Sequence, residues 1–303
     1  MASLRLAALA VLLTVQPAVG QSSSPSAVVF PASAAAAGLG DAFPLATGGA
    51  DVLFYHPGAL NLANGVTATF SAATKSGSLF SAAGAMDWFG GTVVVGMQNG
   101  TYGAAESGAG GLGQTEADLA RGGPVTASES TLSVGYGHEV GPVLMGVTGR
   151  LLSVRAGNTA DRGAALDLGA AFDAGFGVAA LSVQTVGSGL ELGADAVDLP
   201  TRVSLGVATR RRPLGPLDIM AAGAVDRLRG GDFRPGGGIE LSYWPVQGRT
   251  FAGRIGYDHA TPGDPASGLT LGGALMGDDF SLDYAWGRVN DDQSVHRISL
   301  GWR

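Results

Sequence analysis

The segment Phe280-Ser-Leu-Asp-Tyr-Ala-Trp286 alternates large apolar residues with small or polar ones. Successive side chains of a β-strand point to opposite faces, so this period of two predicts a strand with one apolar and one polar face. The same alternation appears in Thr201–Thr209, Thr250–Tyr257 and Val295–Trp302. From Gly65 onward the chain is therefore predicted to be a series of short, two-faced strands.

The alternation and the turn residues between the segments predict about fourteen strands, an even number, as in bacterial single-chain barrels. They are expected at Val66–Ala72, Ser78–Met86, Thr92–Gln98, Ser128–Gly137, Val143–Val154, Gly163–Phe172, Phe176–Gln184, Thr201–Thr209, Leu217–Val225, Pro235–Trp244, Thr250–Tyr257, Gly268–Met276, Asp279–Trp286 and Val295–Trp302.

The composition favours a membrane barrel over a soluble sandwich. Only 14% of the residues are charged, against about 25% in soluble domains. The mean hydropathy is +0.24, yet no segment after the first 20 residues is long and apolar enough to be a transmembrane helix. Apolar residues at every second position of a transmembrane β-barrel reconcile these facts. The net charge of −7 argues against nucleic-acid binding, which needs a basic surface.

The lengths of the predicted connections point the same way. After the even-numbered strands the connections are short, as at Asp87–Gly91 and Gly277–Asp278. After the odd-numbered strands from the third onward they are longer, as at Asn99–Ala127, Arg155–Arg162 and Thr185–Pro200. Short periplasmic turns and long outer loops alternate in this way in outer-membrane barrels.

The first 20 residues have the form of a signal peptide. Arg5 precedes the apolar run Leu6–Val15, and Ala18-Val19-Gly20 forms a small-x-small cleavage site. The run is well short of the roughly 20 residues that span a bilayer. Residues 21–31 are predicted to be a polar leader.

Residues 32–64 differ from everything that follows. They are rich in Ala and Gly and follow neither a strand period nor a helix period. Such a segment lacks the side-chain volume for a core of its own but can pack tightly inside another structure. We predict a small plug of short helices and turns, inside a barrel formed by residues 65–303.

This segment resembles the N-terminal signature of the PorV/PorQ-type outer-membrane barrels, relatives of the FadL transporters. Those proteins carry the pattern G-x-G-x-A-x-x-A, then a small acidic stretch, then Y-N-P-A-G-L. This chain departs from the pattern at two places: His56 replaces the Asn, and Gly58-Ala59 reverses the Ala-Gly. The matching residues are Gly38, Gly40, Ala42, Ala46, Asp51, Tyr55, Pro57, Gly58 and Leu60.

The resemblance implies one of two functions at the outer membrane, neither of them enzymatic. A FadL-like protein would pass or bind small hydrophobic compounds, and a PorV-like protein would hold cargo or partner proteins in type IX secretion. In the first case the apolar plug residues Phe43, Phe54 and Tyr55, with His56, are candidates for ligand contact. The resemblance also implies a monomeric barrel in contact with outer-membrane lipid.

Charged residues on the polar faces of the strands are predicted to meet inside the barrel. An unpaired buried charge costs several kcal/mol, so these residues are expected to form a salt-bridge network that fills the lumen, or else to line a polar passage. They are Asp167, Arg202, Asp218, Glu240, Arg254, Asp283 and Arg297.

Motifs for catalysis and for metal or cofactor binding are missing from the sequence. The chain has no Cys and four His, none in a metal-ligand motif, and it lacks a Gly-x-Ser-x-Gly elbow. The G-x-G-x-x-G match at 108–113 lies in a predicted loop without the strand and helix that dinucleotide binding requires. No cofactor, metal or catalytic residue is expected.

Overall fold

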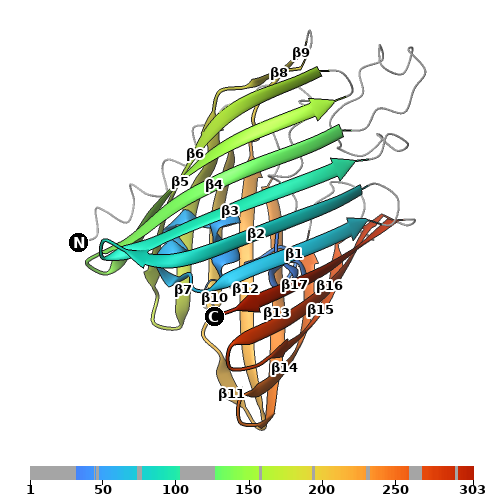
Figure 1. The fold of residues 1–303 in the computed structure, drawn as a ribbon. Coiled ribbons are helices and arrows are strands. Elements are labelled where there is room, and N and C mark those ends of the chain that lie inside the picture. The colour runs from blue at the N-terminus through green and yellow to red at the C-terminus, as the bar shows by residue number, and fades with distance from the viewer. Residues whose placement is uncertain are drawn as a thin grey trace.

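The chain folds into a closed β-barrel around a small N-terminal plug (Figure 1). The structure is a computed structural model that describes residues 32–43, 45, 48–73, 77–102, 127–156, 159–192, 195–229, 233–258, 268–290 and 293–303. The predicted signal peptide and polar leader lie outside these residues, as does the 108–113 motif.

The described strands are antiparallel to their neighbours, and the first strand pairs with the last. Fifteen strands form one sheet, and the pairing of β10 with β12 closes it; without the three-residue β11 the ring has fourteen strands. The ring consists of β1 (Val66–Ala73), β2 (Gly77–Trp88), β3 (Gly91–Tyr102), β4 (Ala127–Val140), β5 (Val143–Ala156), β6 (Thr159–Asp173), β7 (Gly177–Gly187), β10 (Arg202–Thr209), β12 (Leu217–Leu228), β13 (Phe233–Val246), β14 (Arg249–Asp258), β15 (Leu269–Met276), β16 (Phe280–Asn290) and β17 (Gln293–Trp302).

Every predicted strand is present, and the all-β transmembrane barrel of about fourteen strands is confirmed. The expected rhythm of connection lengths is wrong in part. It holds at 103–126, where the connection is long, but β5 and β6 are separated only by residues 157–158 and β16 and β17 only by 291–292. At the end of the barrel where β5 meets β6 and β16 meets β17, the strands extend past the apolar belt. Beyond the belt both faces are polar, so the period of two disappears from the sequence.

Two short elements lie in predicted loops. The connection between β7 and β10 contains a hairpin of β8 (Leu190–Leu192) and β9 (Asp195–Val197), and β11 (Arg212–Leu214) extends the turn after β10. β7 also runs to Gly187, three residues beyond its predicted end.

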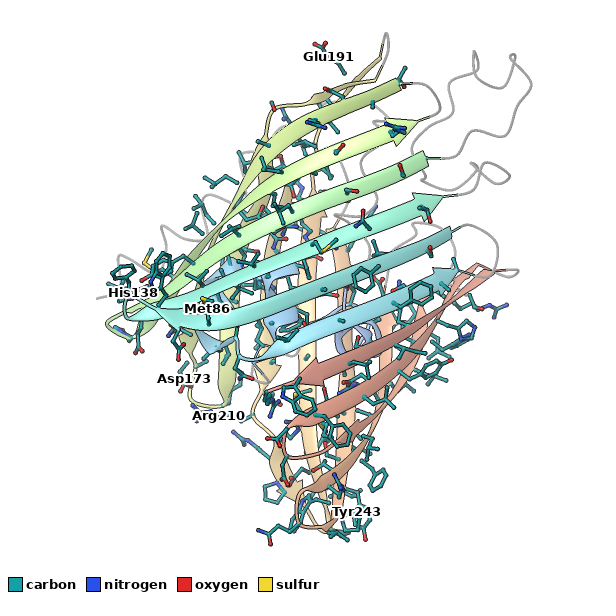
Figure 2. All side chains as sticks on the ribbon, viewed as in Figure 1. Met86, His138, Asp173, Glu191, Arg210 and Tyr243 are labelled. Carbon is teal, nitrogen blue, oxygen red and sulfur yellow. The ribbon has the colours of Figure 1, made fainter. Side chains whose placement is uncertain are left out.

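Apolar side chains face outward and polar side chains face the lumen. Along β17, Ile298 and Leu300 are 48% and 58% exposed, whereas Arg297 and Ser299 are each 6% exposed. Figure 2 shows side chains on both sides of the wall. This inverted sense distinguishes a barrel in lipid from a soluble sandwich, whose apolar face would be the core.

The short turns share one end of the barrel. Glycines with a φ between 62° and 82° occupy the turns after β2, β4, β6, β11 and β13, a conformation that costs glycine little because it has no Cβ. His138 and the ion pair between Asp173 and Arg210 lie at this end, away from Glu191 (Figure 2).

The described part of the plug contains three short helices inside the barrel (Figure 1). Ala is the strongest helix former, and the side chain of Ser33 caps the N-terminus of α2 (Ala34–Ala37). The 3₁₀ helix η3 (Ala50–Phe54) is followed by η4 (Pro57–Leu62), which starts with Pro57, a residue suited to a first helical position. The predicted plug of short helices and turns is therefore confirmed.

Candidate functional site: the plug and the inner wall

Two glycines of the plug motif lie directly against the backbone of the wall. Gly40 has a φ of 67°, and a Cβ there would lie 2.2 Å from the carbonyl oxygen of Tyr257. A Cβ at Gly58 would lie 2.4 Å from the carbonyl carbon of Ala170. Real Cβ atoms do not approach backbone this closely, so only glycine fits at either position.

Three glycines of the wall strands lie against the backbone of the plug. A Cβ at Gly146 would lie 1.9 Å from the carbonyl oxygen of Pro57, and one at Gly236 would lie 2.1 Å from that of Gly40. A Cβ at Gly256 would lie 2.3 Å from the nitrogen of Gly40. These inward glycines are seats for the plug backbone, and the sequence signal for them is Gly at lumen-facing positions of the strands.

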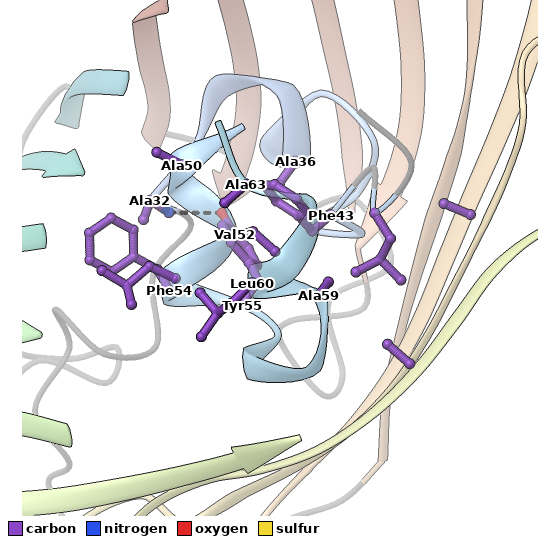
Figure 3. Packing of buried hydrophobic residues seen from close by; sticks show 14 of the residues in the cluster. Ala32, Ala36, Phe43, Ala50, Val52, Phe54, Tyr55, Ala59, Leu60 and Ala63 are labelled. Carbon is purple, nitrogen blue, oxygen red and sulfur yellow. Dashed lines mark hydrogen bonds between the residues drawn. The ribbon is translucent and has the colours of Figure 1, made fainter. Parts of the chain in front are cut away.

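The apolar residues of the plug are covered. Phe43, Phe54, Tyr55 and His56 are each no more than 5% exposed. The Phe43 and Tyr55 rings stack with centroids 4.8 Å apart. Figure 3 shows this packing, in which the Tyr55 hydroxyl accepts a hydrogen bond from the Ala32 nitrogen. In this state the candidate ligand contacts pack within the plug and against the wall.

Two ionisable plug residues are buried at a cost. Burial raises the pKa of the Asp51 carboxyl to about 6, although the Ser33 hydroxyl donates to it. Burial lowers the pKa of His56 to about 3, with a smaller effect from the Arg202 charge. Nδ1 of His56 has no hydrogen-bond partner among the described residues.

The predicted lumen charges are mostly buried and paired, in three groups. Glu240 of β13 binds both Arg254 and Arg211 at 2.7 Å, and Arg254 also binds Asp283 at 2.5 Å. In the second group Nε of Arg150 binds Asp167 at 2.5 Å.

The third group centres on Arg202, which lies 3.8 Å from Asp226 and donates from Nε to Gln184 at 2.7 Å. Arg150, Asp226 and Gln184 were missed by sequence reasoning, although Arg150 and Gln184 stand at inward positions. Arg211, in the short connection after β10, turns toward Glu240.

Two predicted charges stand apart from these groups. Asp218 is on the inner face of β12 but partly exposed, and among the described residues no ion pair involves it. Arg297 is buried near Asp41 and Asp258, and its Nε has no hydrogen-bond partner in the described part of the chain.

The inner wall donates hydrogen bonds to three consecutive plug carbonyls. Arg150 donates to the Leu53 oxygen and Arg202 to the Phe54 oxygen, both at 3.5 Å, and Gln184 donates to the Tyr55 oxygen. The last carbonyls of a helix lack intrahelical partners, and here the wall supplies them for η3. The charged groups therefore fix the plug as well as fill the lumen.

Among the described residues, no cluster of His, Cys, Asp or Glu is arranged to hold a metal ion. None of the described helices is long and apolar enough to cross a membrane.

The fold is similar to that of several solved transporters. Matches include the toluene transporter TodX of Pseudomonas putida (11% identity, TM-score 0.54, 95% of this chain and 98% of that chain) and the toluene transporter TbuX of Ralstonia pickettii (12%, 0.57, 90% and 97%). A FadL homologue of Pseudomonas aeruginosa also matches (10%, 0.55, 89% and 97%). No family model and no curated protein matches the sequence.

These likenesses cover most of both chains, so the shared part includes nearly the whole barrel. At this identity they establish the fold alone. The chain thus has the fold of the FadL-like barrels: fourteen antiparallel strands closed around an N-terminal plug.

Proposed function

We propose that this protein is a non-enzymatic outer-membrane transporter of small hydrophobic compounds, in which movement of the plug opens the barrel. The lipid-facing apolar belt and the short glycine turns at one end support the location. Three proteins of the same fold, described as toluene transporters or as a FadL homologue, support the class of substrate.

The observation that carries the proposal is how the plug is held. It is held by close contact with glycines, by apolar packing against the wall and by hydrogen bonds, among them those to three of its carbonyls. No disulfide ties it to the wall, since the chain has no Cys. Such contacts are individually weak and can be exchanged for others.

The apolar cluster explains why the passing molecule would be hydrophobic. When the plug moves, Phe43, Phe54 and Tyr55 leave their packing and lose buried apolar area, at about 25 cal/mol per Å². A hydrophobic molecule in the opened space restores that burial, whereas a polar one does not. These residues, with His56 beside them, are the proposed contact surface for the substrate.

A disulfide between plug and wall tests the proposal. The Cβ position at residue 137 lies 2.7 Å from Cβ of Leu60 and 2.5 Å from the nitrogen of Asn61. A disulfide needs about 3.8 Å between its Cβ atoms, so the pair Leu60→Cys and Gly137→Cys requires the plug to shift by about 1 Å, and uptake by the single Gly137→Cys variant shows whether the added side chain alone displaces the plug. The assay is uptake of labelled toluene or of a long-chain fatty acid by Gram-negative cells that lack their own barrels of this class.

We expect uptake above the empty-vector level in reduced cells and a loss of at least tenfold on oxidation. Each single Cys variant is the matched control and should not respond to oxidation. Uptake that is unchanged by the tether would show that the plug does not gate the barrel, and no uptake by the reduced protein would refute transport.

The PorV-like role in type IX secretion stays a prediction from the sequence resemblance. Purification from native outer membranes in mild detergent, followed by mass spectrometry of proteins and lipids, separates the two roles. Stoichiometric co-elution of a secretion component, together with absent uptake, would replace the transport proposal. A bound hydrophobic molecule that is lost on Phe54→Ser and Tyr55→Ser substitution would support it.

A further inference from the structure

Strand β7 contains an irregularity next to the plug. On β6, Leu166 pairs with Val186 whereas Leu168 pairs with Val183, so Asp167 lies opposite both Gln184 and Thr185. Two residues opposite one define a β-bulge. We call Gln184-Thr185 the β7 bulge.

The backbone of the β7 bulge is strained. Thr185 has a φ of 57°, which for a β-branched residue is an outlier that costs of the order of 1 kcal/mol or more. Its N–H donates to Oδ1 of Asp167 at 2.6 Å, and its carbonyl oxygen accepts from the Thr201 hydroxyl at 3.3 Å. Side-chain groups therefore bond both polar atoms of the Thr185 backbone.

The β7 bulge directs Gln184 and Thr185 into the lumen together, each 1% exposed. Gln184 donates to the Tyr55 oxygen and accepts from Arg202. Asp167 binds both the Thr185 nitrogen and Arg150. The β7 bulge thus positions Gln184 directly, and it is linked to Arg202 through Gln184 and to Arg150 through Asp167. All three donors to the plug carbonyls are therefore connected to the bulge.

The connection after β7 is tied to a second packed region. Leu190 and Leu199 lie in this connection and form a buried apolar cluster with Leu152 and Val154 of β5 and with Ala165 of β6. If β7 returned to regular pairing, one residue would be passed into this connection, and the cluster would have to repack.

We propose that the β7 bulge is a strained latch: it is kept in place by the docked plug, and release of the plug lets β7 shift register and loosens the 188–201 connection. The inference deepens the proposed function and rests on it, since it requires a plug that moves. Gln184 is a positioning residue in this scheme, and the strain at Thr185 keeps the docked state from being too stable to open.

The test measures thiol labelling, which the absence of native Cys makes possible. Leu60→Cys reports on the plug and Leu199→Cys on the connection, and both parent residues are buried. Gln184→Ala removes the bond to the Tyr55 oxygen and the bond from Arg202. Loss of the bond to the plug, worth about 0.8 kcal/mol, corresponds to a rise of about fourfold in labelling at both sites. Ser182→Ala, a buried change on the same strand without a hydrogen-bond partner among the described residues, is the matched control and should change neither rate.

A second variant is expected to change labelling in the opposite direction. Thr185→Gly relieves the strain, because glycine adopts positive φ freely, and we expect labelling at both sites to fall about threefold. Gln184→Met keeps about the length of the side chain but loses both hydrogen bonds, so it should act like Gln184→Ala and serves if that variant folds poorly.

Equal rates for Gln184→Ala and Ser182→Ala, or labelling of Leu60→Cys that rises without that of Leu199→Cys, would overturn the latch. Uptake that still responds to the Leu60–Gly137 tether would then leave the proposed function intact. Labelling that changes as expected while uptake is absent would refute transport but not the latch.

Discussion

The barrel wall and the plug are stabilised in different ways. In the wall each strand bonds its two neighbours along its length, and the side chains separate into an apolar outer face and a polar inner face. In the plug the helices are short, and they contact the wall through glycine seats, apolar packing and a few polar bonds. A single substitution in such a wall therefore removes few of its contacts, whereas docking of the plug depends on a small number of residues.

The comparison also separates two uses of buried polarity. The group around Glu240 links strands of the wall to one another, whereas Arg150, Arg202 and Gln184 link the wall to the plug. Removing the first should weaken the barrel, and removing the second should release the plug.

The largest effect is expected from filling a seat. Gly146→Ala places a Cβ 1.9 Å from the Pro57 oxygen, so the plug should leave its position and the Leu60→Cys thiol should label completely while the barrel still forms. Gly149→Ala on the same strand meets nothing within 4 Å and should leave the plug docked. Equal labelling in the two variants would disprove the seats.

Breaking the wall group is expected to cost barrel stability. Glu240→Gln leaves Arg254 and Arg211 without their shared carboxylate, and loss of one partner of a buried pair costs about 3–5 kcal/mol. Asp173→Asn, in the exposed pair with Arg210, should cost about 0–1 kcal/mol. Urea unfolding followed by the faster gel migration of the unboiled barrel measures both.

A charge on the outer face tests the lipid belt. Ile298 lies near the middle of β17 and is exposed, so Ile298→Arg should lower the free energy of unfolding in lipid by about 2–4 kcal/mol. Val140 stands at the end of β4 beside a turn, and Val140→Arg should cost about 0–1 kcal/mol. Similar costs at both sites would argue against a belt centred on the strands.

The smallest effect in the native protein concerns pH, because two buried plug residues oppose each other. The pKa of Asp51 is raised to about 6 in the docked plug, so docking is strongest below the ordinary value of 3.8 and weakens as pH rises toward 6. The pKa of His56 is lowered to about 3, so docking is strongest above the ordinary value of 6.5 and weakens as pH falls toward 3.

Burial also raises the pKa of Asp41, so the two components are separated in an Asp41→Asn background. Adding Asp51→Asn leaves His56, and docking should weaken as pH falls below 6.5. Adding His56→Asn leaves Asp51, and docking should weaken as pH rises from 3.8 to 6. Leu60→Cys labelling, normalised at each pH to the Gly146→Ala variant, measures this, and profiles of the same sign would contradict the assignment.

Much of the wall was predictable from the sequence because its signal is local. Lipid outside and polar groups inside impose a period of two on each strand, so Ile298 and Arg297 were assigned to opposite faces correctly. The extra length of β6 and β16 was missed because beyond the membrane the two faces meet the same solvent. Gln184 and Arg150 were missed because their roles depend on where the plug carbonyls lie.

The sequence by itself determined a two-faced barrel of about fourteen strands and a small-residue segment to be buried within it. Alternation and composition are set by the environment of each strand, and that information is local. Only the tertiary structure decided which glycine receives which turn of the plug and that β7 bulges at Thr185. Those contacts join residues far apart in the chain, and their pairing exists only once the sheet has closed and its register is fixed.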